Sequence, residues 1–205
     1  GAYTIVGGAD ADILTGGNNN DTLTGGAGDD VFQVLSGTDT ITDLETGDSF
    51  LVGVEAVAEA LHVLKFTATS ESKNFGQVSI YSYLNGSDID VSLTDLSLST
   101  TSGLGALPKT KGGKLSELKT AKNVSFFLFG SKGPDILTGS NGNDKIYGDE
   151  SNDIIEGLDG NDYIDGGSGT DTISYQNSLV AVTIDLSNSN RQDTNGAGQD
   201  EILNF

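Results

Sequence analysis

The chain has 205 residues, among them 29 Gly but only 2 Pro, and it contains no Cys, Met or Trp. This composition suits turn-rich β structure better than disorder. The formal net charge of −20 argues against a nucleic acid partner, because the phosphate backbone carries charge of the same sign.

A nine-residue unit begins at Gly7 and occurs three times, as GGADADILT, GGNNNDTLT and GGAGDDVFQ, and a degenerate copy, VLSGTDTIT, follows in phase. Each copy has Asp at position 6 and a large apolar residue at position 8. Glycine permits the left-handed backbone of tight turns, and the last three residues suit a short strand with one inward side chain. The unit therefore predicts a six-residue turn and a three-residue strand. A strand containing Tyr3 and Ile5 is expected to lead into this first array.

Residues 44–129 break the repeat. Alternating apolar residues predict strands within residues 61–70, 77–93 and 123–129, with Asn85-Gly86 as a hairpin turn. Residues 54–62 fit a short helix as an alternative, and residues 116–123 are a second, weaker helix candidate. The single histidine, His62, is expected to be a packed or half-exposed side chain rather than a catalytic group.

Five of the ten basic residues lie between Lys109 and Lys122. Such a cluster fits a solvated loop, and it also fits a patch that grips an anionic polysaccharide or the acidic surface of a neighbouring subunit.

The second array runs from Gly130 to Ser174 and reads GSKGPDILT, GSNGNDKIY, GDESNDIIE, GLDGNDYID and GGSGTDTIS. The residues after it are expected to form capping strands, because an uncovered solenoid end exposes strand edges. Apolar side chains in that segment are expected to cover the open end of the roll: Tyr175, Val182, Ile184 and Leu186.

Consecutive copies should lie on opposite sides of a coil, so that copies 18 residues apart stack at about 4.8 Å. Stacking brings together aspartates that repel one another by roughly 4 kcal/mol at 4 Å and an effective dielectric of 20. A cation between the turns reverses this repulsion. Carboxylate and carbonyl oxygens in a many-liganded cage favour Ca²⁺ over Mg²⁺. The candidate ligands are the position 6 aspartates: Asp12, Asp21, Asp30, Asp39, Asp135, Asp144, Asp153, Asp162 and Asp171.

The repeat resembles the G-G-x-G-x-D-x-U-x nonapeptide of the RTX (repeats-in-toxin) family. The resemblance implies a parallel β-roll with Ca²⁺ between adjacent turns, held by the position 6 aspartates and by main-chain carbonyls. Copies with Asp10, Asn19 or Ser151 at position 4, and the copy with Pro134 at position 5, depart from the motif. The resemblance implies at least five ions, two in the first array and three in the second. Expected carbonyl ligands are Gly7, Gly16, Gly25, Gly139, Gly157 and Gly166.

The expected fold is all-β: two right-handed parallel β-rolls separated by a strand-rich region. The expected divisions are residues 1–48 for the first roll with its entry strand, 49–123 for the intervening region and 124–205 for the second roll with its capping strands. The apolar side chains of the second array are too few to offset the entropy of ordering its backbone, so Ca²⁺-coupled folding is expected.

The sequence has no H-E-x-x-H motif, no G-x-S-x-G motif, no phosphate-binding loop and no Cys nucleophile, so no enzyme activity is expected. No transmembrane segment is expected either, because no apolar span is long enough. The resemblance implies a bacterial protein exported by a type I system and located outside the cell or on its surface.

The leading hypothesis is an extracellular calcium-binding structural or adhesive module, and the chain resembles a segment of a large S-layer or RTX adhesin protein. Two alternatives remain: a subunit of a head-to-tail filament or S-layer, and an accessory module of a secreted polysaccharide-acting enzyme. The expected partners are copies of the chain itself or a cell-surface polysaccharide.

Overall fold

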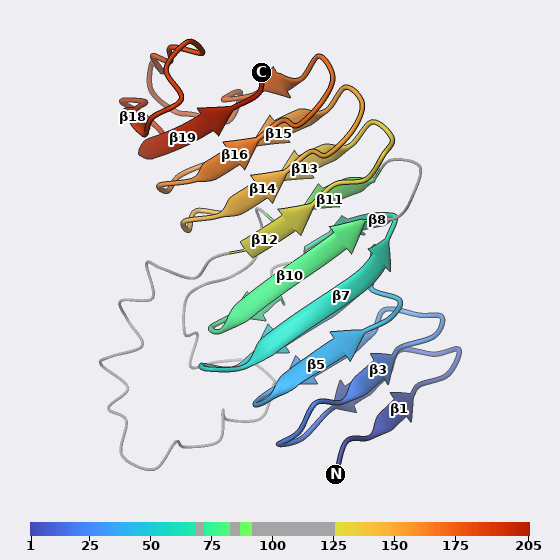
Figure 1. The fold of residues 1–205 in the computed structure, drawn as a ribbon. Helices are drawn as coiled ribbons and strands as arrows, with labels where there is room; N and C mark the ends of the chain where they lie inside the picture. Colours follow the sequence, from blue (N-terminus) through green and yellow to red (C-terminus); the bar gives the residue numbers. More distant parts are fainter. Residues whose placement is uncertain (69–71, 83–86, 92–125) are drawn as a thin grey trace, which may run out of the picture.

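The computed structural model describes residues 1–68, 72–82, 87–91 and 126–205. These residues form strands and turns without any helix, and the chain winds into one parallel β-solenoid of about seven turns. Figure 1 shows the strands of one face lying side by side from the N-terminus at one end to the C-terminus at the other. The expectation of an all-β parallel roll is confirmed.

One face of the solenoid is a ten-stranded sheet in which every pair is parallel except the last, β19 with β18. Its strands, in spatial order, are β1 (Thr4–Val6), β3 (Thr22–Thr24), β5 (Thr38–Ile41), β7 (Val57–Val63), β10 (Gln77–Ser82), β12 (Phe126–Phe129), β14 (Lys145–Tyr147), β16 (Tyr163–Asp165), β19 (Gln199–Leu203) and β18 (Gln192–Asp193).

The other face consists of two parallel sheets. The four-stranded sheet contains β2 (Ile13–Thr15), β4 (Val31–Val34), β6 (Ser49–Val52) and β9 (Lys73–Asn74). The five-stranded sheet contains β8 (Lys65–Thr67), β11 (Asp88–Asp90), β13 (Ile136–Thr138), β15 (Ile154–Glu156) and β17 (Thr172–Ile173).

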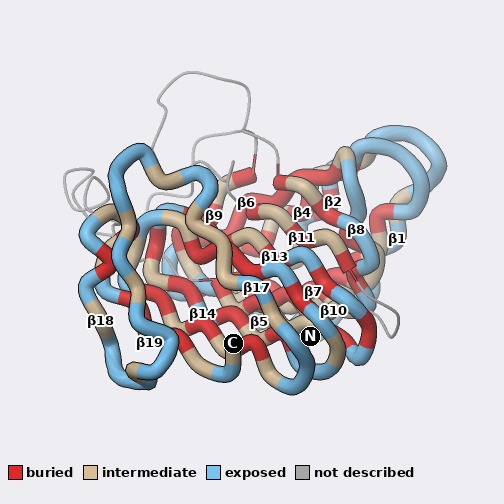
Figure 2. The backbone as a smooth tube through the Cα atoms, turned by 90° about the horizontal axis from the view of Figure 1, so that it is seen from above, coloured by how far each residue is buried: buried red, intermediate tan, exposed pale blue. Residues whose placement is uncertain are grey.

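Strand register follows the nonapeptide within both arrays. Leu23 pairs with Ile41, and Ile146 pairs with Ile164, so that neighbouring strands on one face are 18 residues apart. Figure 2 shows buried stretches along the strands and exposed stretches in the turns between them. The apolar residue at position 8 belongs to the buried core. Eight of these side chains are buried almost completely: Leu14, Leu23, Phe32, Ile41, Leu137, Ile146, Ile155 and Ile164.

The region between the arrays continues the same roll. Asp39 pairs with Ala58, Ala58 with Val78, and Val78 with Phe126, so β7 and β10 connect the first array to the second within one sheet. The strands expected within residues 61–70, 77–93 and 123–129 are present where the structure describes these residues. The boundaries expected at residues 48/49 and 123/124 stay a prediction, but the ten-stranded face crosses both.

The short helix considered as an alternative for residues 54–62 is wrong, because β7 occupies most of this segment. Pairing with β5 and β10 satisfies the backbone on both edges and places Ala58 and Ala60 in the core, which outweighs local helix propensity. His62 is exposed and has a left-handed φ of 61°, in the part of β7 where its register with β10 shifts.

The turn at Asn85-Gly86, the helix candidate at residues 116–123 and the basic cluster from Lys109 to Lys122 lie outside the described residues. The described strands on either side of residues 83–86, β10 and β11, belong to different sheets and are paired in parallel with other strands, so they do not form a hairpin with each other.

The C-terminal cap differs in part from the expectation. Residues 174–191 contain no strand, and Leu186 is 51% exposed, although Tyr175, Val182 and Ile184 are half-buried. The chain returns later instead: β19 extends the ten-stranded sheet beside β16, and β18 pairs antiparallel on its outer edge.

Candidate calcium sites

The repeat places each position 6 aspartate at the end of a glycine-rich turn, at or just before the start of a strand. In five of the nine, one carboxylate oxygen, Oδ1, accepts a hydrogen bond from the main-chain N–H of the aspartate one turn earlier. The Asp12 N–H donates to Asp30 at 2.8 Å, and the Asp21 N–H donates to Asp39 at 2.9 Å. Each carboxylate thereby fixes the spacing of two successive turns.

The second array repeats this arrangement with the same geometry. The three further pairs are Asp135 with Asp153 and Asp153 with Asp171, both at 2.9 Å, and Asp144 with Asp162 at 2.8 Å. All five stacked pairs that the 18-residue spacing predicts are thus brought together in the structure.

The second carboxylate oxygen, Oδ2, distinguishes some of these aspartates from ordinary turn caps. In four of them it is buried and accepts no hydrogen bond: Asp21, Asp39, Asp153 and Asp162. A buried carboxylate oxygen without a donor loses its hydrogen bonds to water and gains none from the protein. This is strongly unfavourable unless a cation takes the place of water.

Burial also shifts the ionisation of these groups. It raises the pKa of Asp153 to about 6 and that of Asp162 to about 9, and neighbouring aspartates add to both shifts. Burial raises the pKa of Asp144 to about 6, although hydrogen bonds from Phe126 and Ser140 oppose the change. The protein alone therefore holds these carboxylates in an environment that disfavours their negative charge, and a bound cation would stabilise that charge.

The glycine at position 1 leaves the space into which these oxygens point. A Cβ on Gly16 would clash with Asp39 Oδ2 and lie 3.1 Å from Asp21 Oδ2, so two unpartnered oxygens converge beside this α-carbon. A Cβ on Gly148 would clash with Asp153 Oδ2 and with the carbonyl oxygen of Gly166. Only glycine leaves this space open.

A carbonyl oxygen from the next turn faces the same space in several rungs. Beside Gly139, the space is shared by Asp144 Oδ2 and the carbonyl of Gly157; beside Gly7, it is shared by Asp12 Oδ2 and the carbonyl of Gly25. Among the expected carbonyl ligands, Gly25, Gly157 and Gly166 face such a space, whereas Gly7, Gly16 and Gly139 border one with their α-carbons. Two unexpected carbonyls also face one: Gly148 beside Gly130 and Asn204 beside Gly166.

The donor set therefore fits Ca²⁺, which accepts many oxygen ligands in a flexible shell. No group of three or more His, Cys, Asp or Glu side chains suited to a metal occurs in the described part of the chain. Any ion between two turns would consequently draw on at most two aspartates, with the carbonyls and water completing its shell.

Two aspartates extend the ladders beyond the predicted set. The Asp30 N–H donates to Asp48 Oδ1 at 2.9 Å, and the Asp162 N–H donates to Asp200 Oδ1 at 3.0 Å. Asp48 keeps the nine-residue phase and has Phe50 two residues later, so the periodicity alone identifies it. Asp200 lies 38 residues after Asp162, and only its pattern of Asp followed by an apolar residue at the second position marks it.

Both added aspartates have their second oxygen satisfied within the protein. Asp48 Oδ2 accepts the Glu45 N–H at 2.9 Å, and Asp200 Oδ2 accepts the Tyr175 hydroxyl at 2.9 Å. Burial and the nearby carboxylates raise the pKa of Tyr175, so its hydroxyl keeps the proton that it donates. Hydrogen bonds from main-chain N–H groups likewise reach Oδ2 of Asp12, Asp135 and Asp144. The unpartnered Oδ2 atoms are those of Asp21, Asp39, Asp153 and Asp162.

The family comparison agrees with this geometry. The model of the RTX calcium-binding nonapeptide repeat (4 copies) matches residues 4–42, 127–155 and 138–173. No curated protein and no solved structure matches the chain. The two arrays are therefore RTX calcium-binding nonapeptide repeats, wound here into one parallel β-roll.

Proposed function

We propose that this chain is an extracellular structural module in which Ca²⁺ bound between stacked turns drives the folding of the two arrays. The observation that carries the proposal is the set of buried, unpartnered Oδ2 atoms on Asp21, Asp39, Asp153 and Asp162. Four such atoms in one repeating position are an energetic burden to the folded chain unless a cation binds there.

The aspartates and carbonyls of adjacent turns would hold the ion, and the ion would supply the positive charge that the acidic turns lack. Of the 30 acidic residues, 19 lie within residues 7–48 and 130–174, which contain only Lys132 and Lys145 as basic residues. Ions that bind only the folded arrays stabilise them by mass action, so a Ca²⁺-rich medium favours the roll over the extended chain.

The module is proposed to be structural rather than catalytic, because RTX repeats are typically calcium-binding scaffolds. RTX repeats are also typical of secreted proteins. In the parts of the chain that the structure describes, no helix is long and apolar enough to span a membrane. We further propose that the module is adhesive and that its partner is a cell-surface polysaccharide or further copies of the chain.

Far-UV circular dichroism and thermal melting, with millimolar Ca²⁺ and then with excess chelator, test the calcium dependence. Removal of Ca²⁺ is expected to reduce the strand signal and lower Tm, and readdition of Ca²⁺ should restore both, whereas Mg²⁺ should not. A strand signal and Tm unchanged by the chelator would refute the proposal.

A pair of variants separates ligand loss from loss of charge. Asp153→Asn removes one charge from the ladder, whereas Asp185→Asn removes one from the exposed C-terminal segment. The first should weaken Ca²⁺ binding in calorimetry by at least about tenfold at one site, and the second should leave it unchanged. Equal effects would mean that only net charge matters. Size-exclusion chromatography with and without Ca²⁺ tests self-assembly separately.

A further inference from the structure

The aspartate ladder on the ten-stranded face is interrupted in the middle of the solenoid. The residue aligned with Asp39 on β7 is Ala58, the next on β10 is Val78, and the next on β12 is Phe126. The ladder resumes at Asp144, whose Oδ1 accepts the Phe126 N–H at 2.8 Å. Three successive turns on this face therefore have an apolar residue where the arrays have a carboxylate.

The opposite face shows the same interruption. The residues in the ladder position before β8 and β11 are Leu64 and Ser87, and the Ser87 hydroxyl donates to Asp135 Oδ1 at 2.8 Å. We define the central belt as β7, β8, β10, β11 and β12. Among its described residues, none of these ladder positions supplies a carboxylate to an ion.

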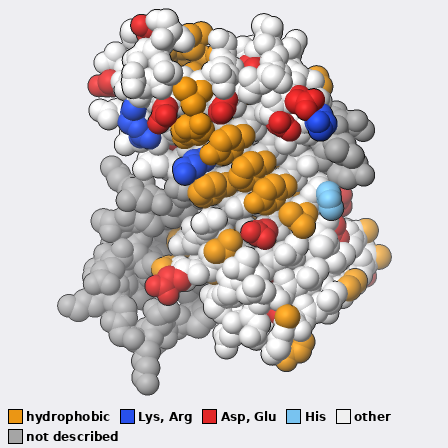
Figure 3. Space-filling model, viewed as in Figure 1, with side chains coloured by type: hydrophobic (Ala, Val, Ile, Leu, Met, Phe, Trp, Pro, Cys, Tyr) orange, Lys and Arg blue, Asp and Glu red, His pale blue; other side chains and the backbone are white. Residues whose placement is uncertain are grey.

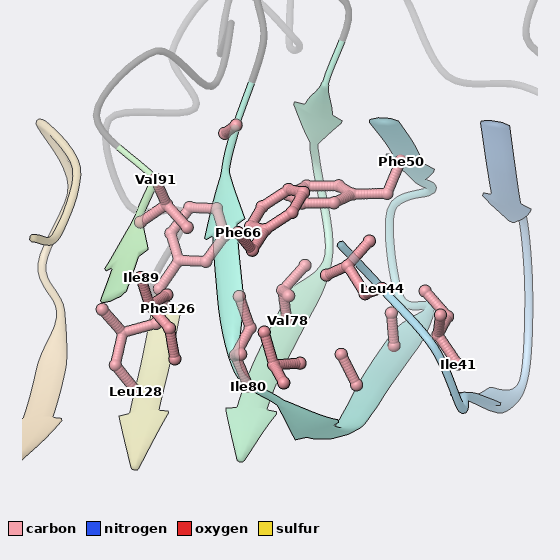
Figure 4. Close-up of a cluster of buried hydrophobic side chains, with 14 of the residues drawn as sticks. Ile41, Leu44, Phe50, Phe66, Val78, Ile80, Ile89, Val91, Phe126 and Leu128 are labelled. Atoms are coloured by element: carbon pink, nitrogen blue, oxygen red, sulfur yellow. The ribbon is translucent and has the colours of Figure 1, made fainter. Parts of the chain in front are cut away.

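Aromatic packing takes the place of the carboxylates inside the belt. The ring of Phe50 on β6 lies 5.8 Å from that of Phe66 and 6.2 Å from that of Phe126, and all three side chains are buried. Figure 4 shows these rings with the aliphatic side chains of Val78 and Ile89 gathered around them. Each belt strand supplies at least one fully buried apolar side chain; β10 and β12 supply two each, and β7 supplies three.

The outer surface of the belt carries a second aromatic row. The rings of Tyr81 and Phe129 are stacked at 4.7 Å, and those of Phe129 and Tyr147 at 5.2 Å, both with an interplanar angle of 3°. Hydrophobic side chains accordingly gather in a band across the middle of this face in Figure 3. Because the ring faces are used against one another, the row ties β10 to β12 and to the first strand of the second array, β14.

Two of the belt strands, β7 and β10, are longer than the strands of the arrays, whereas β8 and β11 have three residues each. β7 has seven residues and β10 has six, whereas β3, β14 and β16 have three each. Longer parallel pairing gives the belt more main-chain hydrogen bonds per turn, in addition to its larger apolar core.

We propose that the central belt folds without Ca²⁺ and acts as a permanent scaffold, from which the two arrays order outward when Ca²⁺ binds. The proposal rests on the proposed function, because it assigns the ions to the arrays. It predicts a partly folded calcium-free state in which the middle of the chain is ordered and both ends are open.

Hydrogen–deuterium exchange of the full chain, with millimolar Ca²⁺ and with excess chelator, tests this directly. Without Ca²⁺, peptides from β3, β14 and β16 should exchange at least about a hundredfold faster, whereas peptides from β7, β10 and β12 should keep most of their protection. Belt peptides that exchange as fast as array peptides in chelator would overturn the inference. Array peptides whose exchange rates do not change with Ca²⁺ would instead contradict the proposed function. The experiment therefore distinguishes failure of this inference from failure of the proposed function.

Two variants give an independent readout by calcium-free melting. Phe66→Leu keeps the belt apolar but removes a ring, and it should lower the midpoint of the residual calcium-free transition. Asp162→Asn lies in an array and should leave that midpoint within about 2 °C of the parent. The inference fails if Asp162→Asn shifts the residual transition and Phe66→Leu does not, because stability would then depend on the ladder.

Discussion

At the level of single residues, the turn glycines and the aspartates act together to form each candidate ion site. In rungs such as that of Asp153, Oδ1 sets the spacing between turns through a main-chain N–H, and the glycine at position 1 leaves room for Oδ2. A carboxylate alone at that position would be a turn cap, and glycine alone would be a flexible turn. Together they leave an oxygen-lined space between turns that no side chain fills.

Gly148→Ala tests the space without changing any charge. Its Cβ would meet Asp153 Oδ2 and the Gly166 carbonyl, so we expect one ion fewer in isothermal titration calorimetry and a lower Tm in Ca²⁺. Gly1→Ala is the matched control, because a Cβ there meets nothing within 4 Å. Unchanged stoichiometry and affinity in Gly148→Ala would show that this space holds no ion.

Asp149 tests backbone strain in the copy that departs most from the motif. It occupies position 2 with a φ of 82°, a region that disfavours side chains with a Cβ. Asp149→Gly should therefore be more stable than Asp149→Ala by about 1 kcal/mol in denaturant unfolding. Both variants remove the same charge, so the difference between them reports strain alone. Equal stabilities of the two variants would show that the backbone at Asp149 is not strained.

At the scale of elements, the three-residue strand divides its side chains sharply between core and surface. In β15, Ile155 is fully buried between Leu137 and Ile173, whereas its neighbour Ile154 is 47% exposed. Ile155→Ala should cost about 2 to 5 kcal/mol in denaturant unfolding with Ca²⁺ present, because it leaves a cavity that the short strands cannot close. Ile154→Ala should stay within about 0.5 kcal/mol of the parent. Similar losses from both would mean that the strand register differs from that described.

The elements also show how far the sequence predicts the structure. Strict nine-residue phase was enough to pair the aspartates and to assign the buried residue at position 8, because each copy repeats the same local geometry. The phase also contains Asp48, which was missed only because the copy around it lacks most of the glycines. Asp200 has no such signal, since 38 residues separate it from its partner Asp162.

The middle of the chain was harder to predict for a physical reason. Residues 54–62 have the spacing of a short amphipathic helix, and only the edges of β5 and β10 make the strand more favourable. The union of both arrays in one sheet depends on pairings such as Val78 with Phe126, which are 48 residues apart and leave no periodic trace. The local sequence pattern predicts the repeat, whereas long-range strand pairing determines that the two arrays share one sheet.

At the scale of the whole molecule, the protein concentrates negative charge in turns that the fold buries. Burial is the main cause that raises the pKa of Asp48, Asp144 and Asp153 to about 6 and that of Asp162 to about 9, from an ordinary value of 3.8. The calcium-free folded arrays therefore bind protons more tightly than the unfolded chain does. Protons and Ca²⁺ are alternative ways to neutralise the same oxygens.

This competition predicts opposite pH dependences with and without the ion. Since the folded pKa values exceed the unfolded ones, the stability that protonation contributes is complete below about pH 4 and is lost as pH rises through 6 and on towards 9. The arrays of the calcium-free protein should therefore lose strand structure as pH rises from about 5 to about 8. In saturating Ca²⁺ the trend should reverse over the same range, because acidification then displaces the ion. Far-UV circular dichroism in metal-stripped buffer and thermal melts in Ca²⁺-containing buffer measure the two trends, and a calcium-free strand signal that rises with pH would contradict the assignment of these carboxylates. Asp162→Asn should weaken both trends, since it removes the group with the largest raised value, whereas Asp185→Asn should leave both in place.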